Sequence, residues 1–351
     1  MKQRGGNMLR MSSDINTQNS FLDFSFPLMH LTTPVLIPTS HVRIGYEHRI
    51  TLFGSCFADA IGSHLADTLF DIDLNPFGTL YNPHSVAIAI RRLLAPRTFT
   101  SADLIHHADA YHSPLHHSDF SAPTAEECLR RINDRLDSSA THLAHTDRLI
   151  ITFGTAYVYR LKDTGAVVGN CHKLPERSFT RSRLSTDDIV HVWAPLLDEL
   201  LSRRPTLQCL FTVSPIRHLR DGLRENTLSK ATLHLAVDRL IALHPDRLDY
   251  FPAYEILLDE LRDYRFYADD MCHPTPLAVR YIFERFRDAC MDPPTRAWLL
   301  RAEAIRRDLD HRPLRPDSDA HRHFLAKTTL KLQQLRSELP LPSTFAPQKK
   351  G

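Results

Sequence analysis

The residues of this sequence best suited to covalent chemistry lie in two short motifs, one near the start of the chain and one near its end. The first contains Ser55, directly after an apolar stretch, and the second contains Asp270 and His273. A carboxylate three residues before an imidazole can orient that ring from one short turn, and the ring can then serve as a base for a hydroxyl. The two motifs together predict a Ser–His–Asp arrangement that transfers acyl groups.

Ser55 stands at a predicted junction between a strand and a helix. Residues 49–53 alternate toward apolar β-formers, which indicates a short buried strand, and residues 58–70 have apolar side chains at helical spacing. A hydroxyl at this junction projects from the carboxyl edge of a sheet, beside the free N–H groups of a helix N-terminus. Such a place suits a nucleophile and a developing oxyanion. Serine is also a preferred N-cap residue, so capping alone is the alternative.

Two of these positions have neighbours that could replace them. Cys56 offers a thiol nucleophile, although adjacent side chains at a strand end point apart, which favours packing as its role. Asp269 could supply the carboxylate but breaks the Asp-x-x-His spacing. His273 itself could be a loop residue that anchors the helix after it. We expect the chemistry to be carried by Ser55, Asp270 and His273.

The elements that must position these residues alternate between strands and helices. Further strands are expected at 70–74, 148–153, 208–213 and 247–251, and helices at 86–94, 125–143, 186–201, 230–243, 254–261 and from 275 through 286. A hairpin is expected at 157–170, and residues 97–120, which have no strong period, are expected to form loops or short helices. This alternation predicts a three-layer α/β/α sandwich around a parallel sheet.

The two ends of the chain have a different pattern. Residues 1–34 are expected to be flexible, with disorder to about residue 25, and the proline-rich segment 24–44 to lie as a strap over the domain. Residues 35–291 are expected to form the α/β domain. Residues 292–351 are expected to be a helical extension, with charged amphipathic helices at 298–309 and 323–335 that either dock on the core or mediate self-association. The sequence does not decide the oligomeric state.

Composition excludes several classes of function. The chain has 351 residues, 42% of them hydrophobic and 24% charged, with a net charge of +2, which argues against a nucleic-acid or membrane-surface partner. No run approaches the roughly 18 apolar residues of a membrane span. Six cysteines without framework spacing, and no apolar signal segment, predict free thiols and a cytoplasmic location. The 21 histidines lack ligand spacing, both Cys-His pairs are adjacent residues, and no phosphate-binding glycine loop is present, so neither metal nor cofactor is expected.

The pentapeptide at 54–58, Gly-Ser-Cys-Phe-Ala, spells the signature of the GSCFA family, which this sequence resembles over roughly residues 35–290. Four more segments are similar to that family: 75–83, 153–156, 169–173 and 214–218. The family resembles a branch of the SGNH/GDSL hydrolases, in which a serine after the first strand and a late Asp-x-x-His form the triad. The resemblance implies a flavodoxin-like sheet and ester hydrolysis through an acyl-Ser55 intermediate.

The resemblance also implies an oxyanion hole. Gly78, in an Asn-Pro-Phe-Gly loop after the second strand, resembles the glycine donor of that superfamily, with a simple turn glycine as the alternative. The third block of the superfamily carries an Asn whose side chain donates to the oxyanion, and here Gly154 and Thr155 occupy that block without it. The candidates to replace this donor are Thr155, Asn75, Asn82 and Asn170.

Two further pairs of residues are expected near the substrate. His172 and Lys173 close the inserted hairpin, and Arg217 and His218 follow the fourth strand, where an arginine could hold an anionic group. The expected substrate is a small-molecule or carbohydrate ester, such as an acetylated hydroxyl compound. An acyltransferase that uses the same triad must exclude water. A non-catalytic binding protein, favoured by the missing Asn, is the other alternative.

Overall fold

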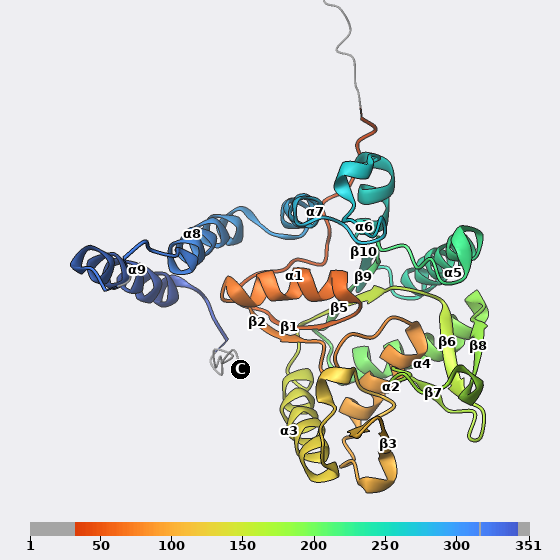
Figure 1. Cartoon of the computed structure of the whole chain (residues 1–351). Helices are drawn as coiled ribbons and strands as arrows, with labels where there is room; N and C mark the ends of the chain where they lie inside the picture. The colour runs from red at the N-terminus through yellow and green to blue at the C-terminus, as the bar shows by residue number, and fades with distance from the viewer. Residues whose placement is uncertain (1–31, 316, 343–351) are drawn as a thin grey trace, which may run out of the picture.

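The computed structural model describes residues 32–315 and 317–342, so most of the expected flexible N-terminal segment lies outside the described residues. Its centre is a five-stranded sheet in which every pairing is parallel (Figure 1). The strands are β1 (Arg49–Phe53), β2 (Asp71–Leu74), β5 (Arg148–Phe153), β9 (Gln208–Val213) and β10 (Leu248–Tyr250). They lie in the order β2-β1-β5-β9-β10, which is the flavodoxin-like order that the resemblance implied.

Helices cover both faces of this sheet, as the alternation of strands and helices predicted. Every residue of β1 and β5 is buried, as in parallel strands covered on both faces. One core lies between the sheet and α2 (Pro83–Leu94), α3 (Ala125–Leu143), α4 (Thr186–Arg203) and α5 (Gly222–Leu243). The second lies between the sheet and α1 (Cys56–Asp67), α6 (Ala253–Glu255) with the π-helical turn Ile256–Glu260, and α7 (Pro276–Cys290). The three-layer sandwich is confirmed.

The start of α5 differs from the prediction. The apolar period begins at residue 230, but the helix begins at Gly222. Its first turns bury polar side chains, among them Asn226 and Ser229, in place of apolar ones. A buried polar face has no hydrophobic period, so sequence pattern alone placed the helix two turns too late.

Two small sheets also differ from the prediction. Residues 97–120 contain a hairpin of β3 (Ile105–His107) and β4 (Ala110–His112), whose histidine-rich strands lack an apolar alternation. The predicted hairpin at 157–170 is present as β6 (Tyr157–Leu161) and β7 (Val167–Val168). A third strand, β8 (Phe179–Arg183), joins it in the order β7-β6-β8.

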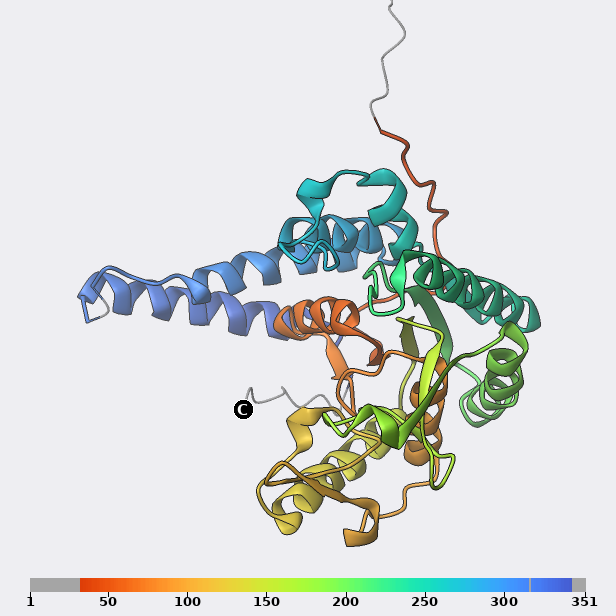
Figure 2. The same ribbon diagram turned by 45° about the vertical axis from the view of Figure 1, so that its right-hand side comes forward.

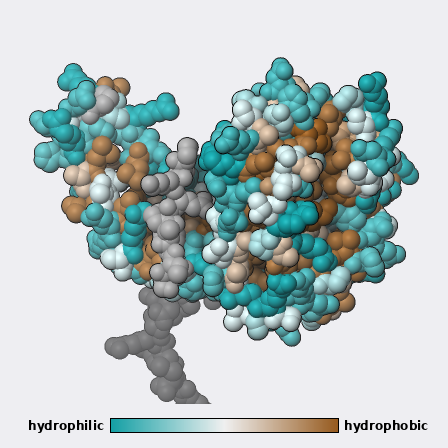
Figure 3. All heavy atoms as spheres, turned by 90° about the horizontal axis from the view of Figure 1, so that it is seen from below, coloured by the Kyte–Doolittle hydropathy of each residue, from teal (hydrophilic) through white to brown (hydrophobic). Residues whose placement is uncertain are grey.

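The C-terminal extension is a pair of helices that projects from one side of the domain (Figure 2). Its first helix, α8 (Pro293–Asp310), docks on the core, where the ring of Trp298 meets Tyr46 edge-on at 6.2 Å and three apolar side chains are buried: Leu299, Ala302 and Ile305. The second, α9 (Asp319–Glu338), packs along α8 with ion pairs between them. Figure 3 shows this extension as a lobe beside the body of the domain, with hydrophilic and hydrophobic residues on its surface. The domain boundary at residue 292 stays a prediction.

Gly54, between β1 and α1, is required by close packing. A Cβ atom at this position would lie 2.6 Å from the Cβ of Thr152 and 2.7 Å from the Cβ of Ala58. The Gly54 N–H donates to Oδ1 of Asn75 at 2.9 Å, which fixes the chain where it leaves the strand. We therefore expect Gly54→Ala to lower the free energy of unfolding by about 1–3 kcal/mol, as overpacking a core does.

Chemical denaturation of the wild type and variant measures this loss. Adding Ala58→Gly should not restore the lost stability, because the Cβ and the backbone oxygen of Thr152 still lie within 3.0 Å of the new Cβ. Glycine at position 58 also costs about 1 kcal/mol inside helix α1. A Gly54→Ala variant as stable as the wild type would show that the strand end is not tightly packed.

Candidate active site

The turn from Asp270 to His273 is organised by one carboxylate. Its Oδ1 accepts the backbone N–H groups of Cys272 and His273, each at 2.9 Å, and its Oδ2 lies 2.5 Å from Nδ1 of the His273 ring. These hydrogen bonds lower the pKa of Asp270 to about 2. The carboxylate is therefore ionised at neutral pH and orients the imidazole through Nδ1, which leaves Nε2 for a reacting group.

Met271, inside this turn, has a left-handed backbone with φ of 57°. A non-glycine residue in that region costs about 1–2 kcal/mol. The conformation allows the chain to double back, so that one carboxylate reaches both following N–H groups and the ring. Local strain that persists at such a place is typical of functional sites.

The Asp270–His273 pair lines a cavity of about 490 Å³. The start of α1 contributes Cys56 to the same cavity, so the two predicted motifs converge there although they are distant in sequence. The Cys56 thiol is exposed, with Sγ 3.5 Å from the hydroxyl of Tyr81. The Tyr81 ring meets the ring of His218 edge-on at 6.0 Å.

His218 lies in the loop after β9, on the wall between Tyr81 and the Asp270–His273 turn. Burial, together with the positive charge of Lys230 and the nearby His273, lowers the pKa of His218 to about 4. Its imidazole is therefore neutral at neutral pH. A neutral ring places no fixed charge beside His273.

Ser55 is fully buried and does not line the cavity. Its hydroxyl donates to Oγ of Ser214, which follows β9, at 3.2 Å. It makes no side-chain capping bond to α1, although it occupies the N-cap position. Among the described residues no hydrogen bond joins Ser55 and His273. The structure thus places Ser55 at the expected strand end, with its hydroxyl toward Ser214.

Lys230 lies beneath this part of the site and was not singled out by the sequence analysis. Its side chain is buried, and Nζ donates to the carbonyls of Ser214 at 2.6 Å and Gly154 at 2.7 Å. The Lys230 side chain therefore links the carboxyl ends of β9 and β5 by two hydrogen bonds. Burial and the positive charge of Arg217 lower the pKa of Lys230 to about 7. The sequence feature that could have indicated this role is a lysine in register with the apolar positions of the predicted helix 230–243.

The residues expected to form the oxyanion hole are largely engaged elsewhere. The Gly78 N–H, expected to donate to the oxyanion, donates instead to the Asn75 carbonyl at 2.7 Å. The Gly78 φ of 74° and the nearby His117 fit a turn glycine. The Asn75 side chain accepts from Gly54 and donates to Asp59.

The other expected donors are held by neighbouring groups. Asn82 lines the cavity, but its side chain caps α2 and donates to the Ser85 hydroxyl at 2.9 Å. The N–H groups of Gly154 and Thr155 both donate to the Tyr81 carbonyl, at 2.8 and 2.9 Å. Thr155 does line the cavity, and its hydroxyl lies 3.1 Å from that of Ser229.

His172 is buried away from the cavity, which contradicts the expectation that it lines the pocket. Its Nε2 lies 2.8 Å from the Ser113 carbonyl, its ring stacks on His112 at 4.6 Å, and burial lowers its pKa. The preceding residues Asn170 and Cys171 reach the cavity in its place. Arg217, as expected, lines the cavity.

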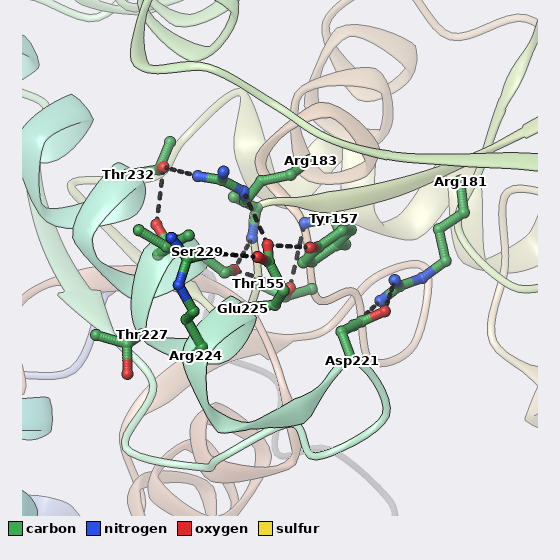
Figure 4. A network of polar contacts seen from close by, with 12 residues as sticks. Thr155, Tyr157, Arg181, Arg183, Asp221, Arg224, Glu225, Thr227, Ser229 and Thr232 are labelled. Carbon is green, nitrogen blue, oxygen red and sulfur yellow. Dashed lines mark hydrogen bonds and ion pairs between the residues drawn. The ribbon is translucent and has the colours of Figure 1, made fainter.

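A network of polar contacts fixes one wall of the cavity (Figure 4). The Arg181 guanidinium lies over the Tyr157 ring, 4.0 Å from its centroid, and pairs with Asp221 with one contact of 2.6 Å. The Tyr157 hydroxyl donates to Glu225 at 2.8 Å. These contacts join β6 and β8 to the first turns of α5. The wall they hold contributes Tyr157, Tyr159 and Arg181 to the cavity.

Two absences apply to residues 32–315 and 317–342. No group of three or more His, Cys, Asp or Glu is arranged to hold a metal ion. No helix there is long and apolar enough to cross a membrane. All six cysteines are free thiols, as predicted.

The fold and the cavity define a flavodoxin-like α/β domain with an oriented Asp–His pair at the carboxyl edge of its sheet. Residues 49–286 match the model of the GSCFA family, and residues 302–341 match that of the GSCFA domain protein, C-terminal domain. This chain belongs to the GSCFA family.

No curated protein matches the sequence. Among solved structures, an acetyl xylan esterase (Est2A) from the rumen bacterium Butyrivibrio proteoclasticus is similar at 12% identity with a TM-score of 0.37. The match covers 76% of this chain and 66% of that one. An identity of 12% with a TM-score of 0.37 does not indicate a shared activity.

Lys230 should make the free energy of unfolding depend on pH. Unfolded lysine has a pKa of about 10.4, so between about pH 7 and 10 the unfolded chain binds more protons at this residue than the folded protein does. Stability from this group therefore rises with pH across that window. We expect the difference in unfolding free energy between wild type and Lys230→Met to grow in favour of the wild type from pH 7 to 10.

Denaturant titrations at several pH values measure this difference. Lys331→Met is the matched control, because Lys331 is a surface residue paired with Asp308 on α8. Its difference from the wild type is measured over the same window for comparison. A flat difference for Lys230→Met would show that the buried amine keeps its ordinary pKa.

Proposed function

We propose that this protein is a serine hydrolase that cleaves the ester bond of a small-molecule substrate. The observation that supports it best is the Asp270–His273 pair, with an ionised carboxylate 2.5 Å from the ring, in a cavity of about 490 Å³ at the start of α1. Cavities of this size accommodate small ligands. An acylated carbohydrate or a similar hydroxyl compound is the class of ester we propose.

In this mechanism Ser55 is the nucleophile and His273 the base. The Ser55 oxygen bonds to the ester carbonyl carbon, and its proton passes to Nε2 of His273. The imidazolium, stabilised by Asp270, then gives this proton to the leaving alkoxide as the ester C–O bond breaks. Water repeats the sequence on the acyl-Ser55 ester, with His273 again as the base, and releases a carboxylic acid and free Ser55.

Before it reacts, the Ser55 hydroxyl must break its hydrogen bond to the Ser214 hydroxyl. Rotation about χ1 moves Oγ between staggered positions. The hydrogen bond that is exchanged has a net value of about 1 kcal/mol, which is small beside a catalytic barrier. In enzymes without substrate, catalytic hydrogen bonds are often long or poorly aligned, so a rotation of this kind is compatible with a serine nucleophile.

The N-terminus of α1 is the oxyanion site that we propose. The N–H groups of a helix's first turn have no partner within the helix, and the Ser55 side chain does not cap them. Cys56, in this first turn, borders the cavity. Backbone donors and the positive end of the helix dipole stabilise a developing oxyanion. This arrangement needs no side-chain Asn, whose absence was the main departure from the superfamily pattern.

Cys56 provides a second candidate nucleophile because its thiol is exposed and lines the cavity, while the hydroxyl of Ser55 is buried. The thiolate would attack the same carbonyl and form a thioester in place of an ester. The two candidates share the same base and differ in one adjacent residue, so a single pair of variants separates them.

A fluorophosphonate probe tests the nucleophile, because phosphonylation needs the same deprotonation and oxyanion site as acyl transfer. We expect Ser55→Ala to abolish labelling and Cys56→Ser to label like the wild type. His273→Ala should slow labelling by a factor on the order of 10³ or more, since members of a catalytic unit act together. Asp270→Asn should leave slow residual labelling, because it disturbs the ring's tautomer and keeps the base.

Intact-mass spectrometry measures the labelling, and a thermal melt of each variant confirms that it is folded. Labelling that persists in Ser55→Ala and disappears in Cys56→Ser would make the thiol the nucleophile. A folded wild type that is never labelled by probes of several sizes would favour a binding protein of this fold. Transfer of the acyl group to an added alcohol in preference to water would indicate an acyltransferase.

A further inference from the structure

A second cavity, of about 650 Å³, adjoins the candidate active site. Arg217 and Leu219, in the loop after β9, line both cavities, so this loop forms a shared wall. The second cavity extends from that wall to the first turn of α5 and to the segment 258–271. A substrate that occupies the first cavity can therefore extend into the second along the same surface.

The lining of this second cavity includes large apolar side chains that are exposed to solvent. The exposed fractions are 47% for Leu219, 56% for Leu223, 78% for Tyr264 and 51% for Met271. Single exposed apolar residues are ordinary, but a group of them around one hollow marks a binding surface. The group continues directly from a cavity that contains an oriented Asp–His pair, which favours an occupant that is part of the same substrate.

The second cavity lies on the histidine side of the candidate site. Met271 belongs to the turn that carries Asp270 and His273, and the strained backbone of that turn brings Met271 to the cavity lining. In the proposed mechanism His273 protonates the leaving oxygen, so the alcohol part of the ester lies beside this ring. In this mechanism the acyl part lies in the first cavity, which Tyr157 and Tyr159 line.

We propose that the second cavity binds an apolar part of the leaving alcohol, so that among esters of hydroxyl compounds those whose alcohol carries an apolar group are preferred over those of an unmodified carbohydrate. This inference rests on the proposed hydrolase function and adds a substrate class to it. Each methylene buried there should raise kcat/KM by roughly two- to four-fold. A chain extended by four methylenes should therefore gain roughly 16- to 256-fold.

Two series of esters test the assignment. The first varies the alcohol at constant acetyl group, from ethyl acetate to hexyl acetate, and the second varies the acyl group at constant ethanol, from ethyl acetate to ethyl hexanoate. A pH-stat measures the acid released. We expect kcat/KM to rise roughly 16- to 256-fold in the alcohol series and to change much less in the acyl series.

Leu223→Asp should remove the rise in the alcohol series, because it replaces one of the exposed apolar side chains of the lining with a carboxylate. Leu235→Asp is the matched control, since Leu235 is on the same helix, 60% exposed and outside both cavities. The control should keep the rise. A rise in the acyl series alone, or a rise that survives Leu223→Asp, would overturn the inference.

Binding of hexyl acetate, followed by saturation-transfer NMR, separates failure of this inference from failure of the proposed function. Binding that is weakened by Leu223→Asp but not by Leu235→Asp, without cleavage of any ester, would overturn the hydrolase and with it the leaving-group assignment. Cleavage of short esters with hexyl acetate binding unaffected by Leu223→Asp would overturn only the second-cavity assignment.

Discussion

The candidate site depends on the buried ammonium of Lys230, which holds the carbonyls that follow two neighbouring strands. Its hydrogen bond to the Ser214 carbonyl fixes the residue whose hydroxyl accepts a hydrogen bond from Ser55. Its hydrogen bond to the Gly154 carbonyl fixes the end of the central strand β5. A buried cation without a carboxylate partner costs free energy, and its hydrogen bonds to backbone carbonyls offset part of that cost. The lowered pKa of this lysine is the measurable sign of the arrangement.

The other half of the site is a self-contained turn. The Asp270 carboxylate binds two backbone N–H groups and the His273 ring, so that the imidazole is oriented before any substrate arrives. Met271 has a strained, left-handed backbone conformation in this turn and also lines the second cavity. The same local geometry therefore orients the proposed base and shapes the surface beside it. In the proposed reaction, chemistry and selection of the alcohol would be set by one short segment.

The site predictions that failed share a physical cause. Gly78 was expected to donate to an oxyanion, and Asn75 and Asn82 were two of the four candidates for a second donor. Gly78 builds a turn, Asn75 holds a strand end, and Asn82, although it lines the cavity, caps a helix. His172 was expected in the pocket and packs on His112 instead. A polar residue next to a predicted site looks the same in sequence whether it faces a ligand or satisfies the backbone, because only the folded chain decides which partner is nearest.

The sequence alone predicted the five strands of the central sheet and the helices that cover it, because burial on both faces of a parallel sheet leaves continuous apolar runs. It also determined the Asp270–His273 turn, since residues three apart meet without help from distant segments. The sequence did not predict three contacts that the folded chain makes: the Ser55 hydroxyl with Ser214, Cys56 with the cavity, and Lys230 with the carbonyls of Ser214 and Gly154. These contacts join residues that are far apart in the chain, and their geometry is set by packing between layers, which no local pattern records.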